Sequence, residues 1–351
     1  MPLSPGLRVC WRPCMTDRAT LSQAFVASAG WGAARRRFLA GDASDRSYDR
    51  LSMGNKTAVL MDAPPGKGDD PATFLAIADH LTGLGLSAPR LLAKDLTHGF
   101  LLLEDLGDDT YARLIAVQPA LEMRLYDAAL DVLLHIHQSP APAGLPDLTA
   151  TEWATAACFA PDWYRFAITG TRLDTAEFHH TLTQTLQSHA DSPRVMILRD
   201  YHAENLLWLP DRAGTARVGL LDFQLAQMGQ PGYDVVSLCQ DARRDVAPQT
   251  EAALVARFAS TQAQPDTFPV AYATLGAQRA LRILGIFARL CLVGGKPGYV
   301  ALIPRVWGQL QRNLAHPALA PLADICAQLL PEPTSEALSR ITDQCGQHLS
   351  R

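Results

Sequence analysis

The chain has 351 residues, of which 48% are hydrophobic, so it can bury a large core and is long enough for two lobes or domains. Its 31 Lys and Arg nearly balance 35 Asp and Glu, which argues against a nucleic acid or an acidic membrane surface as partner and favours a small ligand. The seven cysteines form no Cys-x-x-Cys pair and no zinc-type cluster with His, a pattern typical of reduced thiols in the cytoplasm.

The beginning of the chain predicts little structure. Residues 1–19 contain no apolar run of the length that a signal peptide needs, and we expect them to be a disordered leader. The longest apolar stretch in the second half, over 283–293, is interrupted by Arg289 and is much shorter than a bilayer span. We therefore expect no membrane segment and a cytoplasmic location.

The next segment, up to residue 104, has the pattern of a small sheet with one helix. A short helix is expected over 20–31, with Thr20 or Ser22 as its cap. Strand-like runs follow, separated by turns that contain Gly, and a second helical pattern over 71–84 interrupts them. The runs are 37–40, 48–53, 57–62, 90–93 and 100–104, and they predict a five-stranded antiparallel sheet.

After residue 106 the pattern becomes mainly helical, and one cluster of short strands interrupts it. Apolar residues at helical spacing predict long amphipathic helices over 121–136, 174–190, 250–262 and 270–293. The strand-like runs lie over 195–198, 205–209 and 217–223. The expected fold class is therefore α+β, with a sheet-based lobe over 20–106 and a helical lobe over 107–351.

The strand cluster carries three side chains that together suggest a chemistry. Asp200 and Asn205 lie in one loop, and the hairpin that follows brings Asp222 back beside Asn205. Phosphoryl transfer from ATP needs oxygen ligands for Mg²⁺ and a carboxylate that orients the attacking hydroxyl. A purely structural interpretation, in which the three residues cap a hairpin, is the alternative.

These features resemble the aminoglycoside phosphotransferase and choline kinase superfamily, whose two lobes are protein-kinase-like, and the resemblance covers roughly residues 35–320. Within it, the chain is most similar to the bacterial anomeric kinases that phosphorylate N-acetylmuramate and N-acetylglucosamine in cell-wall recycling. The segments that carry this similarity are 41–48, 59–65, 102–107, 222–224, 233–238, 285–290 and 294–299.

The resemblance implies a two-lobed kinase with ATP and Mg²⁺ as cofactors. Asp200 would be the catalytic base, and Asn205 and Asp222 would hold the metal. Residues 20–106 would bind the nucleotide, and 107–351 would hold the catalytic loop and the acceptor site. In the first lobe, the Gly41–Ser44 turn would cover the phosphates through backbone N–H groups and the Ser44 hydroxyl, while an ordinary hairpin turn is the alternative. The backbone of Glu104 to Leu106 would bind adenine, or else be a simple strand end.

The chain departs from the family pattern at two positions. Met61 stands where the third strand of related kinases carries Lys, so another cation is needed near the triphosphate. We propose Arg46 as the first candidate and Lys56 as the second. For Lys56, a solvated strand residue is the simpler interpretation. Leu198 stands where related loops carry a bracing His, which suggests that packing braces the loop here.

Two further polar residues in this region have simple structural explanations. His202 is a tempting replacement for the missing His, but a loop His is as often structural or exposed. Asp234 is expected to cap the N-terminus of a helix, which would explain it without a catalytic role.

Two sequence features bear on the acceptor. The helical lobe shows no acidic run that would suit a polycationic aminoglycoside, which favours a neutral or anionic sugar. The lactyl carboxylate of N-acetylmuramate would need a cation, for which Arg243, Arg244, Arg282 and Arg289 are available. A kinase for aminoglycosides, choline or homoserine and a nucleotide-binding pseudokinase stay open as alternatives. A monomer is expected.

Overall fold

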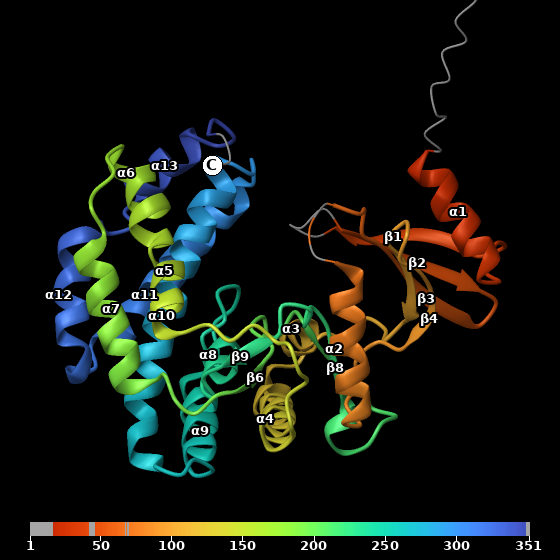
Figure 1. Cartoon of the computed structure of the whole chain (residues 1–351), viewed down its shortest axis with the longest axis horizontal. Coiled ribbons are helices and arrows are strands. Elements are labelled where there is room, and N and C mark those ends of the chain that lie inside the picture. The colour runs from red at the N-terminus through yellow and green to blue at the C-terminus, as the bar shows by residue number, and fades with distance from the viewer. Residues whose placement is uncertain (1–16, 42–45, 67, 69, 349–351) are drawn as a thin grey trace, which may run out of the picture. The chain divides into compact units, whose positions relative to one another are not determined.

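The computed structural model describes residues 17–41, 46–66, 68 and 70–348. The chain divides into two compact units (Figure 1). The first comprises Met1–Ala76 and Pro89–Asp105, and the second comprises Ile77–Ala88 and Leu106–Arg351. Helix α2 (Pro71–Gly83) therefore begins in the first unit and ends in the second.

An antiparallel sheet of five strands forms most of the first unit, in the order β1-β2-β3-β5-β4. Strands β1 to β3 follow one another as hairpins, and Gly54, with φ 61°, supplies the left-handed conformation that the turn between β2 and β3 requires. The strands are β1 (Arg35–Gly41), β2 (Ser47–Met53), β3 (Lys56–Asp62), β4 (Leu91–Asp95) and β5 (Phe100–Glu104). The predicted sheet is confirmed, with each strand within a few residues of its expected position.

Helix α1 (Arg18–Ser28) packs on this sheet through Phe25 and Val26. Both side chains are buried in a cluster with apolar residues of β2, β3 and β5, and the Phe25 and Phe100 rings stack with centroids 5.7 Å apart. Burial of large apolar side chains is worth about 1.5–3 kcal/mol each, so this contact anchors the helix.

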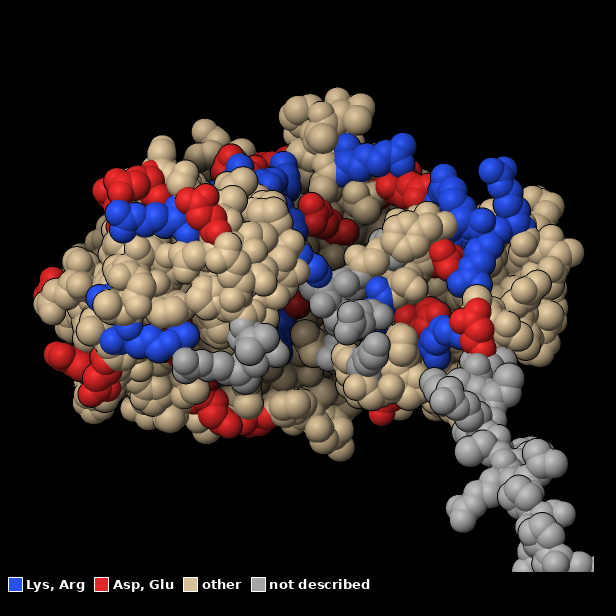
Figure 2. All heavy atoms as spheres, turned by 90° about the horizontal axis from the view of Figure 1, so that it is seen from above, with Lys and Arg blue, Asp and Glu red and all other residues tan. Residues whose placement is uncertain are grey.

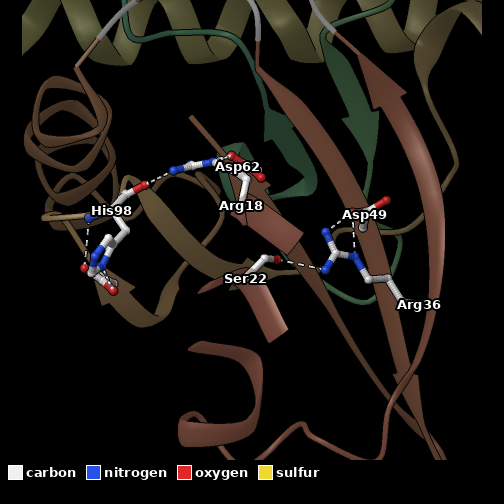
Figure 3. A network of polar contacts seen from close by, with 7 residues as sticks. Arg18, Ser22, Arg36, Asp49, Asp62 and His98 are labelled. Carbon is white, nitrogen blue, oxygen red and sulfur yellow. Dashed lines mark hydrogen bonds and ion pairs between the residues drawn. The ribbon is translucent and has the colours of Figure 1, made fainter. Parts of the chain in front are cut away.

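Polar contacts at the edge of the same interface fix the start of α1 (Figure 3). Arg18 Nε donates to Asp62 Oδ1 at 2.8 Å, and Arg36 Nη1 donates to Ser22 Oγ at 2.8 Å. The expected cap at Thr20 or Ser22 is wrong, because the helix begins at Arg18 after the N-cap residue Asp17. Ser22 instead lies buried inside the helix as the acceptor for Arg36. Of the predicted leader, residues 1–16 lie outside the described part of the chain.

The second unit is mainly helical, as predicted, and Figure 1 shows its helices from yellow to blue. The long helix α10 is buried along most of its length and contacts α5, α8, α11 and the π-helical turn Ala160–Arg165. The helices are α3 (Tyr111–Val117), α4 (Glu122–Gln138), α5 (Ala150–Ala157), α6 (Phe166–Thr169), α7 (Ala176–His189), α8 (Tyr233–Cys239), α9 (Pro248–Ala259), α10 (Phe268–Leu292), α11 (Ile303–Leu314), α12 (Ala320–Leu329) and α13 (Ser335–Asp343).

Two small antiparallel ladders lie among these helices and carry the candidate site. Strand β6 (Val195–Ile197) pairs with β9 (Gln227–Gly229), and β7 (Leu206–Trp208) pairs with β8 (Val218–Leu220). The sequence did not predict β9, and the strand expected to run to residue 223 ends at Leu220. The reason is local, because Asp222 adopts φ 56°, which a strand does not allow.

The surface carries charges of both signs. On the face shown in Figure 2, Lys and Arg side chains lie beside Asp and Glu side chains, and the whole chain has a formal net charge of -4. Across the residues that the structure describes, no helix combines the length and apolar character that crossing a membrane would require.

Candidate active site

The loop between β6 and β7 holds two of the three predicted site residues, Asp200 and Asn205. Its backbone is closed on itself by hydrogen bonds from Asp200 N to Leu198 O and from Asn205 N to His202 O, both at 2.9 Å. The buried Tyr201 hydroxyl donates to Ala129 O on α4 at 2.8 Å. These contacts fix the conformation of the loop.

The loop is also braced from α8 by Asp234. This fully buried carboxylate accepts from Leu198 N at 2.6 Å through Oδ2 and from Arg199 N at 2.8 Å through Oδ1. Burial raises the pKa of Asp234 to about 7, while the two backbone hydrogen bonds act in the opposite direction. The predicted N-capping role of Asp234 is wrong, since Gly232 is the N-cap residue of α8 and Asp234 points at the loop instead. A carboxylate from α8 thus replaces the missing His, where we expected packing.

Asn205 connects the other two predicted residues. Its Nδ2 donates to Asp200 O at 2.9 Å and lies 3.5 Å from Asp222 Oδ2. Leu221 N donates to Asn205 O at 2.9 Å, which ties the segment before Asp222 to the loop. The structure therefore brings Asp200, Asn205 and Asp222 together. Among the described residues, the side-chain hydrogen bonds of Asn205 all involve Nδ2, so its Oδ1 is the atom available to a ligand.

Asp222 is held in a defined orientation by a residue that the sequence reasoning did not assign. Gln224 is buried, and its Nε2 donates to Asp222 Oδ1 at 2.8 Å. The sequence segment Asp222-Phe223-Gln224 contains this Gln. A Gln two residues after a carboxylate predicts no contact by itself, because the contact depends on a turn that brings the Gln side chain back to Asp222. The left-handed conformation of Asp222 creates that turn.

Backbone strain is concentrated at this cluster. In the part of the chain that the structure describes, Arg199 with φ 72° and Asp222 with φ 56° are the non-glycine residues with positive φ. Such conformations cost about 1–3 kcal/mol each and persist where the surroundings enforce them, most often at functional sites.

His202 supports Asn205 from within the loop. The ring is buried, and its Nε2 lies 3.3 Å from Asn205 Nδ2 and 3.4 Å from Arg243 Nη1. Burial, with a smaller contribution from the Arg243 and Arg279 charges, lowers the pKa of His202 to about 3. Since both neighbours are donors, a neutral ring accepts at Nε2, and the residue positions Asn205 instead of carrying protons.

The Asp200 carboxylate is partly exposed and makes no hydrogen bond or ion pair within the described residues. It is therefore available to a ligand. Those residues contain no group of three or more His, Cys, Asp or Glu able to hold a metal. Asn205 and Asp222 nevertheless fit Mg²⁺, which is usually bound by one or two protein oxygens and completes its octahedron with phosphates and water.

The residues predicted to contact the nucleotide phosphates differ in their positions. Ser44 lies outside the described residues. Arg46 is buried immediately before the first residue of β2. Lys56 is exposed and is the first residue of β3, where it pairs with Met53 at the other end of β2. Six strand residues separate these ends by roughly 20 Å. Lys56 is therefore a solvated strand residue, whereas Arg46 stays a candidate.

The segment expected to bind adenine is fixed in part by ion pairs. The Glu104 carboxylate pairs with Arg90, with Oε2 3.1 Å from Nε, and Glu104 N donates to Arg90 O at 2.8 Å. Leu106 is the first residue of this segment in the second unit. Met61, at the position of the missing Lys, is fully buried and contributes to the core of the first unit.

One buried ion pair in the first unit was not predicted. Arg50 on β2 contacts Asp105, with Nη2 2.9 Å from Oδ1 and Nε 2.8 Å from Oδ2. Both side chains are largely buried, so removal of either partner would leave a buried charge. The pair ties Asp105, the last residue of the unit, to the sheet.

A five-stranded antiparallel sheet, a helical unit, and a cluster of Asp, Asn and Asp beside a braced loop define a kinase-like phosphotransferase. A model of the phosphotransferase enzyme family matches residues 35–271. This match covers more than half of the chain, and the chain belongs to that family.

Relatives with known names support the same assignment. The chain is 40% identical over 346 residues to the N-acetylmuramate/N-acetylglucosamine kinase of Caulobacter vibrioides, with 88% of this chain and 95% of the relative covered. It is 35% identical to the kinase of the same name from Pseudomonas aeruginosa, with 90% and 95% covered. The solved structure of a microcompartment-associated aminopropanol kinase shares the fold, with a TM-score of 0.61 and 16% identity over 86% of this chain and 99% of that chain.

Proposed function

We propose that the protein is an ATP- and Mg²⁺-dependent kinase that phosphorylates the anomeric hydroxyl of N-acetylmuramate and N-acetylglucosamine. The observation that carries this proposal is the convergence of Asp200, Asn205 and Asp222 on a loop that Asp234 braces. The names of the relatives at 40% and 35% identity support the choice of acceptor.

Each of the three residues has a role that follows from its surroundings. Asp200, whose carboxylate has no hydrogen bond or ion pair among the described residues, would orient the acceptor hydroxyl and accept its proton. Asn205 Oδ1 and the Asp222 carboxylate would hold Mg²⁺. When bound, the metal supplies charge neutralisation at the phosphates. His202 and Gln224 would keep the two metal-binding side chains in their orientations.

An anomeric hydroxyl suits this arrangement chemically. The ring oxygen makes that hydroxyl more acidic than an ordinary alcohol, so a carboxylate needs only to align it and take its proton late in the transfer. Most of the acceleration then comes from alignment and charge neutralisation, which a preorganised loop provides.

Nucleotide binding by residues 20–106 belongs to the same proposal. We assign the phosphates to Ser44 and Arg46 and the adenine to the backbone of Glu104 and Leu106. The cation is needed because Mg²⁺ alone leaves net negative charge on the triphosphate. The cytoplasmic location and the monomeric state also stay predictions.

The direct test is ATP consumption measured side by side with N-acetylmuramate, N-acetylglucosamine, choline, homoserine and kanamycin. We expect turnover with the two amino sugars. Asp200→Asn should lower kcat by roughly a hundred- to ten-thousandfold, the range for positioned acid–base groups. Asp222→Ala should abolish Mg²⁺-dependent turnover in a folded protein.

Asp211→Asn is the matched control, because Asp211 is exposed in the turn between β7 and β8. It should leave turnover unchanged. Preference for choline, homoserine or kanamycin would refute the proposed acceptor, and an Asp200→Asn variant as active as Asp211→Asn would remove Asp200 from its assigned role.

A further inference from the structure

Four arginines of the second unit were candidates for a cation near the acceptor, and three of them have partners. Arg243 Nε lies 2.8 Å from Glu204 Oε2, and Arg244 Nη2 lies 2.9 Å from Glu122 Oε2. The Arg289 guanidinium stacks over the Trp163 ring at 5.7 Å. Arg282 on α10 makes no hydrogen bond, ion pair or ring contact with the residues that the structure describes, although it is only partly exposed. Among those residues, no carboxylate is paired with it.

A second arginine, Arg199, lies in the same loop as Asp200 and Asn205. Arg199 directly precedes Asp200, and its Nε is buried without a hydrogen-bond partner among the described residues. Its backbone is held on both sides, because its N–H donates to Asp234 Oδ1 at 2.8 Å and its carbonyl accepts from Ser237 Oγ at 3.1 Å. The strained conformation of Arg199 is thus enforced, which fixes the direction in which its side chain leaves the loop.

Helix α10 carries Arg282 toward the side of the loop where Arg199 lies. The helix contacts α8 (Figure 1), and on it Arg279 donates to Ser237 Oγ at 3.0 Å, the hydroxyl that in turn donates to Arg199 O. Arg282 follows Arg279 by three positions and lies on the same face of α10. The contacts from Arg279 through Ser237 therefore direct Arg282 to the side of the loop that carries Arg199.

The two guanidinium groups affect one another. Burial, followed by the charge of Arg282, lowers the pKa of Arg199. The charges of Tyr233, Asp200 and Asp234 act in the opposite direction, and Asp234 also accepts two backbone hydrogen bonds from the loop. Two partly buried like charges are unfavourable unless an anion lies between them.

We propose that Arg282 and Arg199 form a carboxylate subsite beside Asp200, which binds the lactyl group of N-acetylmuramate. This proposal rests on the proposed function. Arg199 precedes Asp200 and its backbone is bound to α8, whereas Asn205 and Asp222, the candidate metal ligands, follow Asp200 in the chain. We assign the subsite to the acceptor because Arg199 directly adjoins Asp200, the candidate base that would contact the acceptor hydroxyl. The planar guanidinium group binds a carboxylate through two parallel hydrogen bonds, which sets the orientation of the sugar as well as its affinity.

N-acetylglucosamine provides an internal control because it has no carboxylate. Arg282→Gln should lower kcat/KM for N-acetylmuramate by about ten- to a hundredfold, the effect of losing a charged hydrogen-bonded pair, and leave kcat/KM for N-acetylglucosamine and the KM for ATP within about twofold. Arg282→Lys should restore part of the loss. Arg305→Gln is the matched control, since Arg305 on α11 pairs with Asp245 and should affect neither sugar.

A second variant and a second measurement protect the test against misfolding. Arg199→Gln should show the same selective loss, and the Arg199→Gln/Arg282→Gln double variant should lose less than the product of the single effects, because both residues act on one carboxylate. Calorimetric titration of the wild type and of Arg282→Gln should show weakened binding of N-acetylmuramate alone, with unchanged unfolding midpoints.

The alternative results are distinguishable. Equal losses on both sugars, or no loss on N-acetylmuramate, would overturn the subsite. A raised KM for ATP in Arg282→Gln would assign the anion site to nucleotide phosphate instead, which also overturns it. A wild-type enzyme that acts on neither sugar would refute the proposed function itself, and the subsite with it.

Discussion

His202 offers a sharp test of how the loop is held. The ring Nε2 lies between two donors, Asn205 Nδ2 and Arg243 Nη1. His202→Phe keeps most of the volume and removes the acceptor, so the Asn205 amide loses one of the contacts that orient it. A buried donor left without a partner costs about 1–3 kcal/mol. We expect a stability loss of that size, a lower kcat and a higher Mg²⁺ requirement.

The pH dependence of the free energy of unfolding gives a second, independent test of the buried, neutral state of His202. The pKa of His202 is lowered from 6.5 to about 3, so the folded protein keeps the ring neutral while the unfolded chain protonates it near pH 6.5. The unfolded state therefore binds more protons below that pH, and stability falls as the pH falls from 6.5 toward 3. With these two pKa values, His202 accounts for a loss of about 1.4 kcal/mol between about pH 7.5 and 5.5.

The measurement is urea unfolding of the wild type, His202→Phe and His202→Gln at both pH values. In His202→Gln, an amide oxygen lies near the position of Nε2, so this variant should be more stable than His202→Phe at pH 7.5. Because Gln does not titrate, the variant should also lose the part of the pH dependence of stability that His202 causes. His137, whose pKa burial lowers to about 4, adds a similar slope to all three proteins, so the comparison between them isolates His202. Equal pH slopes in wild type and His202→Gln would refute the assignment of a neutral, buried His202, and unchanged kcat in His202→Phe would refute its role in orienting Asn205.

Two further substitutions test the supports of the site. Asp234→Ala removes the acceptor of two loop N–H groups, so it should lower the free energy of unfolding by about 2–5 kcal/mol and also lower kcat. Urea unfolding and turnover assays measure the two effects. A loss of activity without a loss of stability would contradict the bracing role. Gly285→Ala places a Cβ 2.0 Å from Phe159 O, so overpacking should lower the free energy of unfolding by at least about 2 kcal/mol. Gly308→Ala on α11 is the control, because its Cβ meets nothing within 4 Å and should raise the free energy of unfolding by up to about 1 kcal/mol. Similar thermal midpoints for the two glycine variants would contradict the close approach of α10 to Phe159.

The sequence alone located the site because its signal is local. Asp200 and Asn205 lie in one short loop, a hairpin brings back Asp222, and turns that contain Gly separate the strands of the first unit. Helix α11 was missed although its signal was present, since Ile303, Val306, Leu310 and Leu314 follow helical spacing and are buried.

What the sequence determined about this protein is the set of periodic and short-range features: the five strands, the long helices and the spacing of three oxygen-bearing side chains. The tertiary structure decided what supports them, because the Arg50–Asp105 pair joins residues 55 positions apart and the contact of Asp234 with the loop joins residues 35 and 36 apart. It also decided that, among the described residues, two of the four arginines near the acceptor form ion pairs, one contacts a Trp ring, and Arg282 has none of these contacts. No local pattern encodes such choices, since they depend on which buried polar groups meet when helices far apart in the chain pack together.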